Sequence, residues 1–91
     1  MFDDEVAPLR AEIDRLNMEI AAKIAERVDI SLRIGSLKAK YNLPIIDEAR
    51  EAMVYIQVKR LAKQYNLSEE GLKRVFKEII SICIEAEEAH Q

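Results

Sequence analysis

The longest periodic stretch of the chain, from Leu9 to Tyr41, constrains the fold most. Apolar residues recur there at spacings that mostly alternate between three and four, and no proline interrupts them. They are Leu9, Ile13, Leu16, Ile20, Ile24, Ile30, Ile34 and Leu37. This pattern predicts one amphipathic helix of about 35 residues, roughly 50 Å long, in which Gly35 is the one weak point. A compact domain of this size is only about 25 Å across, so the helix needs a partner along its length. A second copy of the chain is the economical partner, and we expect a homodimer.

The two ends of this helix carry recognisable signals. Asp3 and Asp4 can cap its start, which we place near residue 4 or 5, and Pro8 is then tolerated in the first turn. The segment around Pro44 ends the helix, because proline disfavours the helical conformation in the residue before it.

Downstream of residue 44, the sequence predicts two shorter helices and no strand. Asp47 and Ser68 are suitable N-caps for them. The expected inward-facing residues are Val54, Val58, Leu61 and Tyr65 in the second helix, and Leu72, Val75, Phe76, Ile79, Ile80, Cys83 and Ile84 in the third. We therefore expect an all-α fold of three helices, one very long, in a single domain over residues 1–91.

Composition narrows the class of protein but indicates no chemistry. Hydrophobic residues make up 49% of the chain and charged residues 34%, which is typical of one soluble domain. The net charge of -3 and the lack of an uninterrupted basic run argue against nucleic-acid binding. The lone Cys83 fits a reducing compartment, and the acidic N-terminus resembles neither a signal peptide nor a membrane span. We expect a cytoplasmic protein.

Cations interrupt the apolar stripe of the long helix. Arg27 and Lys38 are 11 residues apart, so they share a face to within about 20° and lie about 16 Å apart along the axis. Arg10 lies 17 residues before Arg27, roughly 100° away around the helix. In an antiparallel dimer, however, Arg10 of one chain would come near the far part of the other. A pocket built from both subunits is therefore geometrically reasonable.

Polar residues also occur on the faces of the shorter helices that carry apolar residues. Cys83 and Glu87 are four residues apart on the third helix, on a face that continues its apolar stripe. Arg50 and Glu51 follow the cap Asp47 by three and four residues. The four cations of this set suit a small dianion, because an arginine fork donates two parallel hydrogen bonds to a carboxylate.

Each of these residues also has an ordinary structural interpretation. A single helix cation is usually solvated or ion-paired, and Glu87 could belong to an acidic tail. Cys83 fits a small core residue better than a nucleophile, because the only histidine, His90, lies near the end of the chain. The sequence has no metal-ligand cluster, Gly-rich phosphate loop or Ser/His/Asp set. Periodicity alone therefore favours a noncatalytic helical dimerisation module.

The order and spacing of these residues along the chain form a series of motifs. The chain reads Leu9-Arg10 with Ile13-Asp14, then Ala25-Glu26-Arg27, Gly35 with Lys38, Pro44 with Asp47, Arg50 and Glu51, and finally Phe76 with Ile79-Ile80. This series, from residue 9 to about 88, resembles the all-helical class of chorismate mutase. The resemblance implies an intertwined homodimer with two active sites that convert chorismate to prephenate in phenylalanine and tyrosine biosynthesis, without a cofactor.

The resemblance also implies a role for each site residue. Arg10 from the other subunit and Arg27 would bind the two carboxylates of the substrate. Lys38 would bind a carboxylate and the ether oxygen, with Arg50 near the carboxylate side. Glu51 would hold the ring hydroxyl, near backbone polar groups of Asp47. Two positions depart from the commonest bacterial pattern: Cys83 stands where serine is often found, and Glu87 where glutamine usually donates to the ether oxygen, although some fungal members have glutamate there.

The chemistry of this rearrangement fits the residues present. It is unimolecular and pericyclic, so an enzyme supplies confinement of the folded substrate and stabilisation of negative charge on the ether oxygen. Glu87 could donate a hydrogen bond to that oxygen only when protonated. The alternatives are an isochorismate pyruvate lyase, which shares this fold and much of the cationic pocket, and the noncatalytic module. Glu51 and the loop before Asp47 favour the mutase over the lyase.

Overall fold

The structure is a computed structural model that describes residues 1–90. Those residues form three helices and no strand: α1 (Phe2–Lys40), α2 (Glu48–Gln64) and α3 (Glu69–Ala89). The expected all-α class, with one very long helix, is confirmed. The expected domain over residues 1–91 remains a prediction, and Gln91 lies outside the described residues.

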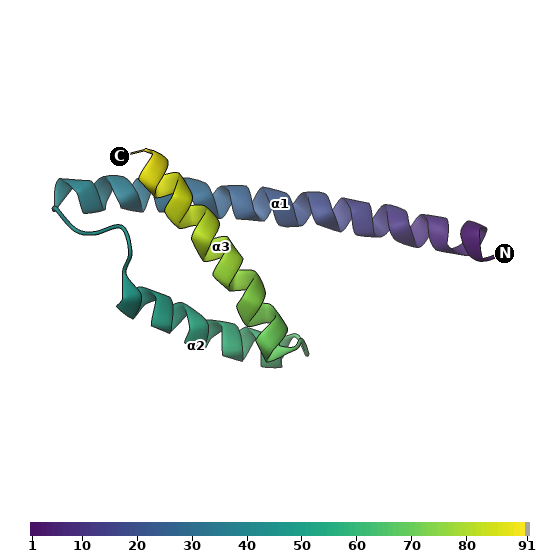
Figure 1. Ribbon diagram of the computed structural model, residues 1–91. Coiled ribbons are helices and arrows are strands. Elements are labelled where there is room, and N and C mark those ends of the chain that lie inside the picture. The colour runs from purple at the N-terminus through teal and green to yellow at the C-terminus, as the bar shows by residue number, and fades with distance from the viewer. Residues whose placement is uncertain (91) are drawn as a thin grey trace.

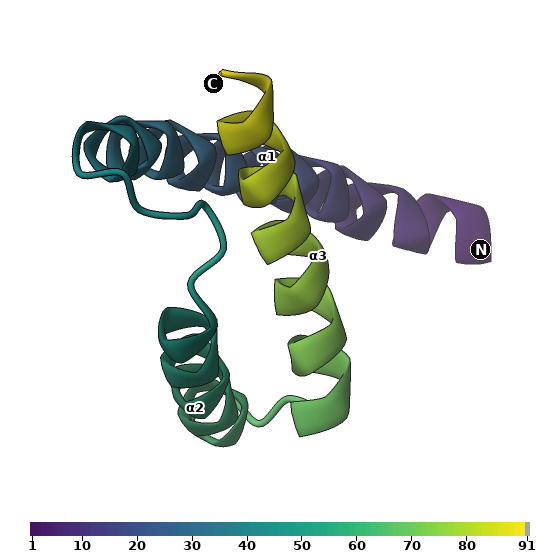
Figure 2. The same cartoon turned by 60° about the vertical axis from the view of Figure 1, so that its left-hand side comes forward.

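The chain is elongated because α1 extends well beyond the other two helices. It measures 61 × 27 × 15 Å and has a radius of gyration of 16.9 Å, against about 13 Å for a compact domain of this length. In Figures 1 and 2, α3 crosses the C-terminal half of α1 and also packs along α2, while the N-terminal half of α1 projects freely. Within residues 1–90, α1 and α2 each contact α3 but not one another. α3 thus connects α1 and α2, which lie apart from one another.

The start of α1 differs from the sequence prediction. The helix begins at Phe2, and its N-cap Met1 offers no side-chain hydrogen bond. Asp3 and Asp4 lie in the first turn, where they stabilise the positive end of the helix dipole without capping it. Pro8 lies beyond the first turn, inside the helix, so its expected position was wrong. Its ring nitrogen cannot donate to the carbonyl of Asp4.

The other helix ends follow from local chemistry. Asp47 Oδ1 accepts from the backbone N–H of Arg50 at 3.0 Å, and Ser68 Oγ accepts from that of Gly71 at 3.0 Å, so both predicted caps are confirmed. Two residues beyond the end of α1 and of α2 lies an asparagine in the left-handed conformation, Asn42 (φ 56°) and Asn66 (φ 54°). The backbone N–H groups after these turns bond back to carbonyls of the last helical turn, an arrangement known as the Schellman motif.

The core lies between α2 and α3. Val54, Val58 and Ile80 are its buried centre, and several partly buried residues pack around them: Tyr55, Leu72, Phe76 and Ile84. Two predicted inward residues, Tyr65 and Val75, are instead 64% and 52% exposed. Within the chain α2 packs only on α3, so the helix buries a narrow row four residues apart, which continues from Val58 to Ala62 rather than to Tyr65.

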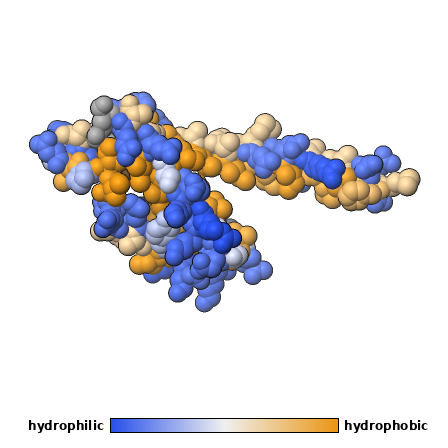
Figure 3. All heavy atoms as spheres, viewed as in Figure 1, coloured by the Kyte–Doolittle hydropathy of each residue, from blue (hydrophilic) through white to orange (hydrophobic). Residues whose placement is uncertain are grey.

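The apolar stripe of α1 remains largely uncovered in the single chain. Leu9, Ile13 and Ile20 are 63%, 55% and 58% exposed, and Figure 3 shows apolar atoms along one side of the projecting helix. Among residues 1–90, no helix is both long enough and apolar enough to span a membrane. The homodimer and the cytoplasmic location stay predictions.

Candidate functional site

A pocket of about 450 Å³ lies where the three helices surround a common space. Small-molecule sites typically measure about 300–1,000 Å³. Its lining combines isoleucine and valine side chains with charged groups, and Figure 3 shows both kinds of surface where α3 crosses α1. The lining residues are Arg27, Ile30, Ser31, Ile34, Lys38, Ile45, Asp47, Arg50, Glu51, Val54, Ile80, Cys83, Ile84 and Glu87. The pocket therefore contains every predicted site residue except Arg10.

Two half-buried cations of α1 form one wall. Arg27 and Lys38 both line the pocket, as expected from residues 11 apart on one face. The Lys38 side chain is 18% exposed, and its Nζ donates a hydrogen bond to the backbone carbonyl of Ile45. Lys38 thereby ties the segment between α1 and α2 to the pocket.

The opposite wall is the C-terminal half of α3. Cys83 is 4% exposed, and its Sγ accepts a hydrogen bond from Arg27 Nη1 at 2.9 Å. Glu87 is 6% exposed and is the one buried charged residue among residues 1–90. Its Oε1 lies 3.7 Å from Lys38 Nζ. The predicted continuation of the α3 stripe to Glu87 is thus observed, and it brings a carboxyl group beside an ammonium group.

The start of α2 forms the third side of the pocket. Glu51 is half-buried, whereas Asp47 and Arg50 are exposed. The Asp47 carboxylate already accepts from the backbone of Arg50 as the helix cap, so it has less capacity to bind a ligand. Glu51 is the freer acceptor on this side.

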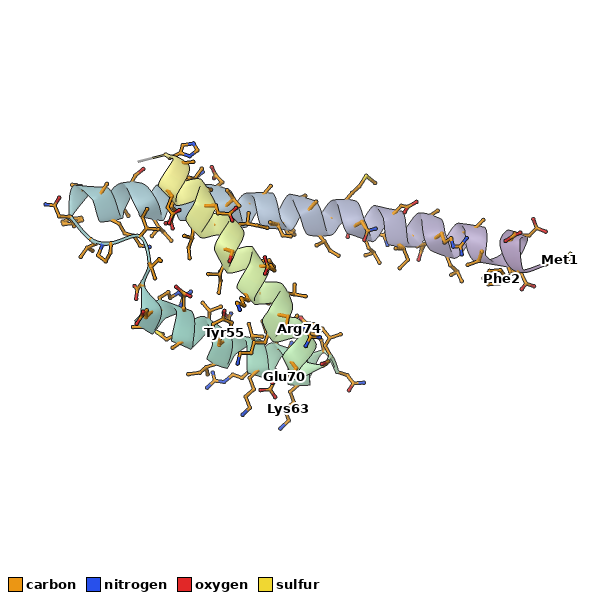
Figure 4. The ribbon with its side chains drawn as sticks, viewed as in Figure 1. Met1, Phe2, Tyr55, Lys63, Glu70 and Arg74 are labelled. Atoms are coloured by element: carbon orange, nitrogen blue, oxygen red, sulfur yellow. The ribbon has the colours of Figure 1, made fainter. Side chains whose placement is uncertain are left out.

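Arg10 lies far from this pocket. Its side chain is exposed, with the guanidinium 5.8 Å from the centre of the Phe2 ring. Figure 4 shows Phe2 at the free tip of α1, beyond the reach of α2 and α3. Arg10 therefore does not line the pocket of its own chain.

The formal charges of the lining residues sum to zero in the pocket of a single chain. Three basic residues line it (Arg27, Lys38 and Arg50), and three acidic residues do so as well (Asp47, Glu51 and Glu87). A doubly negative ligand would be better matched if a further cation entered the pocket or if one carboxyl group were protonated. Walls that combine apolar side chains with a few converging polar groups suit a small ligand that carries both apolar surface and anionic groups.

Two lining residues were not singled out from the sequence. Ser31 follows Arg27 by four residues and precedes Lys38 by seven, so helical spacing could have identified it. Ile45 lies outside the helices, where no periodicity exists to predict which way its carbonyl points. Within residues 1–90, no group of three or more potential metal-binding side chains gathers.

Comparison with known proteins agrees with the resemblance drawn from the motifs. Residues 9–88 match the family model of chorismate mutase type II. The chain is 32% identical to a chorismate mutase of Methanocaldococcus jannaschii over 89 residues, which cover 97% of this chain and 85% of that protein. It is 38% identical over 87 residues to a bifunctional chorismate mutase/prephenate dehydratase of Aquifex aeolicus, covering 92% of this chain and 24% of the larger protein. A 4-amino-4-deoxychorismate mutase of Streptomyces venezuelae is 28% identical over 78 residues, covering 86% of this chain and 76% of that protein.

Proposed function

The chain belongs to the chorismate mutase type II family, and we propose that its pocket converts chorismate to prephenate. The reaction is an isomerisation: the C–O bond of the ether breaks while a C–C bond forms in the same molecule. The observation that carries this proposal is the grouping of Arg27, Lys38 and Glu87 in one pocket of suitable size. Carboxylate binding and stabilisation of the departing ether oxygen both need such groups.

Each pocket wall has a proposed task. Arg27 binds a substrate carboxylate through its planar fork, and Arg50 lies on the same carboxylate side. Lys38 contacts a carboxylate and donates to the ether oxygen as negative charge develops there. Glu51 accepts from the ring hydroxyl, next to backbone groups of Asp47. Cys83 holds Arg27 in place through the hydrogen bond at 2.9 Å, since its Sγ accepts from the guanidinium.

The second carboxylate needs another cation, and we propose that the partner subunit supplies it as Arg10. Support comes from the exposed apolar stripe on the projecting half of α1, which a second chain would cover. An open apolar groove lined by Leu16, Ile20, Ile24, Phe76 and Ile79 continues this surface where α3 meets α1. With Arg10 added and Glu87 protonated, the pocket would carry an excess of positive charge suited to a dianion.

The direct test is loss of chorismate absorbance with purified protein, measured at mildly acidic and at neutral pH. We expect turnover, with prephenate identified by its conversion in acid to phenylpyruvate. A folded protein that leaves chorismate unchanged at both pH values would contradict the proposal. Salicylate and pyruvate formed from isochorismate, without prephenate from chorismate, would identify the lyase instead.

Glu87 gives the reaction a predicted pH dependence. It contacts Lys38 on α1, shares its face of α3 with Cys83, and shares the pocket with Arg27 and Glu51. An ionised carboxylate has no proton to donate and would repel the ether oxygen, whereas a protonated one can donate. We therefore expect kcat/KM to decline as pH rises, because only a carboxyl group that carries its proton can donate to the ether oxygen. Glutamine donates at any pH, so Glu87→Gln should flatten this decline.

The measurement is kcat/KM from about pH 5 to about pH 9 for the parent protein, Glu87→Gln and Glu88→Gln. Glu88 is the exposed neighbour on α3 and does not line the pocket, so its substitution is the matched control. An identical pH profile for the parent and Glu87→Gln would show that Glu87 is not the donor.

A further inference from the structure

Gly35 is the buried residue of α1, and the side chain that covers it is Glu87. A Cβ atom placed on Gly35 would lie 3.2 Å from Glu87 Cγ and 3.3 Å from Glu87 Oε1. Lys38 follows Gly35 by three residues and approaches the same Oε1, with its Nζ at 3.7 Å. The carboxyl group of Glu87 therefore lies against bare helix backbone beside the ammonium group.

The glycine is not needed for the backbone itself. No glycine of residues 1–90 has a positive φ, and Gly35 lies inside a continuous helix. Alanine would favour that helix more, because glycine loses more conformational freedom on folding. Its value at this position thus lies in the space that it leaves for Glu87.

We propose that Gly35 is a positioning residue that sets how closely Glu87 approaches α1 and hence where its carboxyl group stands relative to Lys38. This inference rests on the proposed function of Glu87 and Lys38. Contacts of 3.2 and 3.3 Å are tighter than ordinary van der Waals distance, so an added methyl group would push Glu87 away. Because Cγ of Glu87 carries the carboxyl group, displacement of Cγ moves this hydrogen-bond donor away from the ether oxygen of the substrate.

Gly35→Ala should lower kcat several-fold, up to about 10-fold, because the added methyl group displaces Glu87 by a few tenths of an ångström, and a misplacement of about 1 Å costs about 100-fold. The KM should change much less, because Arg27 and the other carboxylate-binding groups are untouched. The midpoint of thermal unfolding should change little, since the gain in helix propensity offsets the cost of displacing Glu87. Ser36→Ala is the matched control on the same helix: Ser36 is exposed and lies outside the pocket, so its kcat should stay that of the parent.

Combining Gly35→Ala with each of two Glu87 substitutions separates a positioning role from a general effect on the helix. Glutamine has the shape of glutamate, so Gly35→Ala should cost the same factor in kcat in Glu87→Gln as in the parent. In Glu87→Ala the colliding atoms are gone, so adding Gly35→Ala should cost nothing further. An equal loss of kcat in the alanine background would overturn the proposal.

Crystal structures of the parent and of Gly35→Ala supply a readout that does not depend on turnover. We expect the Lys38 Nζ to Glu87 Oε1 distance to lengthen in the variant with α1 unchanged. An unchanged distance would overturn the positioning role, even if the parent protein rearranged chorismate. A parent without mutase activity would instead contradict the proposed function, and the two structures would still decide whether Gly35 positions Glu87.

Discussion

Lys38→Met is expected to lower kcat by about 10²- to 10³-fold, which corresponds to about 3–4 kcal/mol of lost transition-state stabilisation. Isoleucine and valine side chains line part of the pocket and the Lys38 side chain is only 18% exposed, so water screens the ammonium group less than it would at the surface. Methionine keeps most of the length of the side chain but has no donor for the ether oxygen. The measurement is steady-state turnover of chorismate by parent and variant at one pH.

Lys40→Met is the matched control for this substitution. Lys40 lies two residues later in the last turn of α1, and its Nζ lies 5.5 Å from the centre of the Tyr41 ring, outside the pocket. Its replacement removes the same charge from the same helix end, so kcat should stay close to that of the parent. Equal losses in the two variants would mean that net charge, rather than a positioned donor, explains the effect. A Lys38→Met protein with a helical circular dichroism spectrum and parent-like kcat would contradict the role of Lys38.

The sequence predicted which residues share one pocket better than it predicted the borders of the core, and helix geometry explains why. Arg27 and Lys38 meet in one pocket because a spacing of 11 residues returns to the same helix face whatever packs against it. Cys83 and Glu87 share a face for the same reason. Periodicity does not reveal how wide a strip of that face a neighbouring helix covers, so Tyr65 and Val75 were wrongly placed inside.

Local chemistry made some helix ends predictable and left others unpredictable. The caps Asp47 and Ser68 were predictable because a short polar side chain satisfies the first free N–H groups of its own helix. The start of α1 was not predictable, because it depends on whether a few exposed residues extend a helix that has already formed. The role inferred for Gly35 could not be predicted from the sequence either, because it depends on a contact with Glu87, which lies far away along the chain.

The proposed two-subunit site predicts the other large effect. Arg10→Ala and Arg27→Ala should each lose about 2–5 kcal/mol of transition-state stabilisation, since each leaves a substrate carboxylate without its cation. Arg27→Lys should also lose activity, because a lysine ammonium cannot replace the planar fork. A noncatalytic dimerisation module would tolerate that conservative change. The measurement is kcat/KM, with sedimentation to verify that each variant has the mass of a dimer, twice the 10.5 kDa of the chain.

Mixing the two inactive variants then separates a shared site from one formed within a single chain. Arg10 lies near the free tip of α1 and Arg27 in the pocket, so in a shared site they come from different chains. When equal amounts of Arg10→Ala and Arg27→Ala chains are unfolded together and refolded, half of the dimers should be mixed. In a mixed dimer one site carries both substitutions, while the other combines Arg27 of the Arg10→Ala chain with Arg10 of its partner. Activity should therefore recover to about one quarter of the parent level. If each site used Arg10 of its own chain, every site would retain one substitution, and mixing would restore no activity. A fully active monomer in dilute solution would also contradict the shared site.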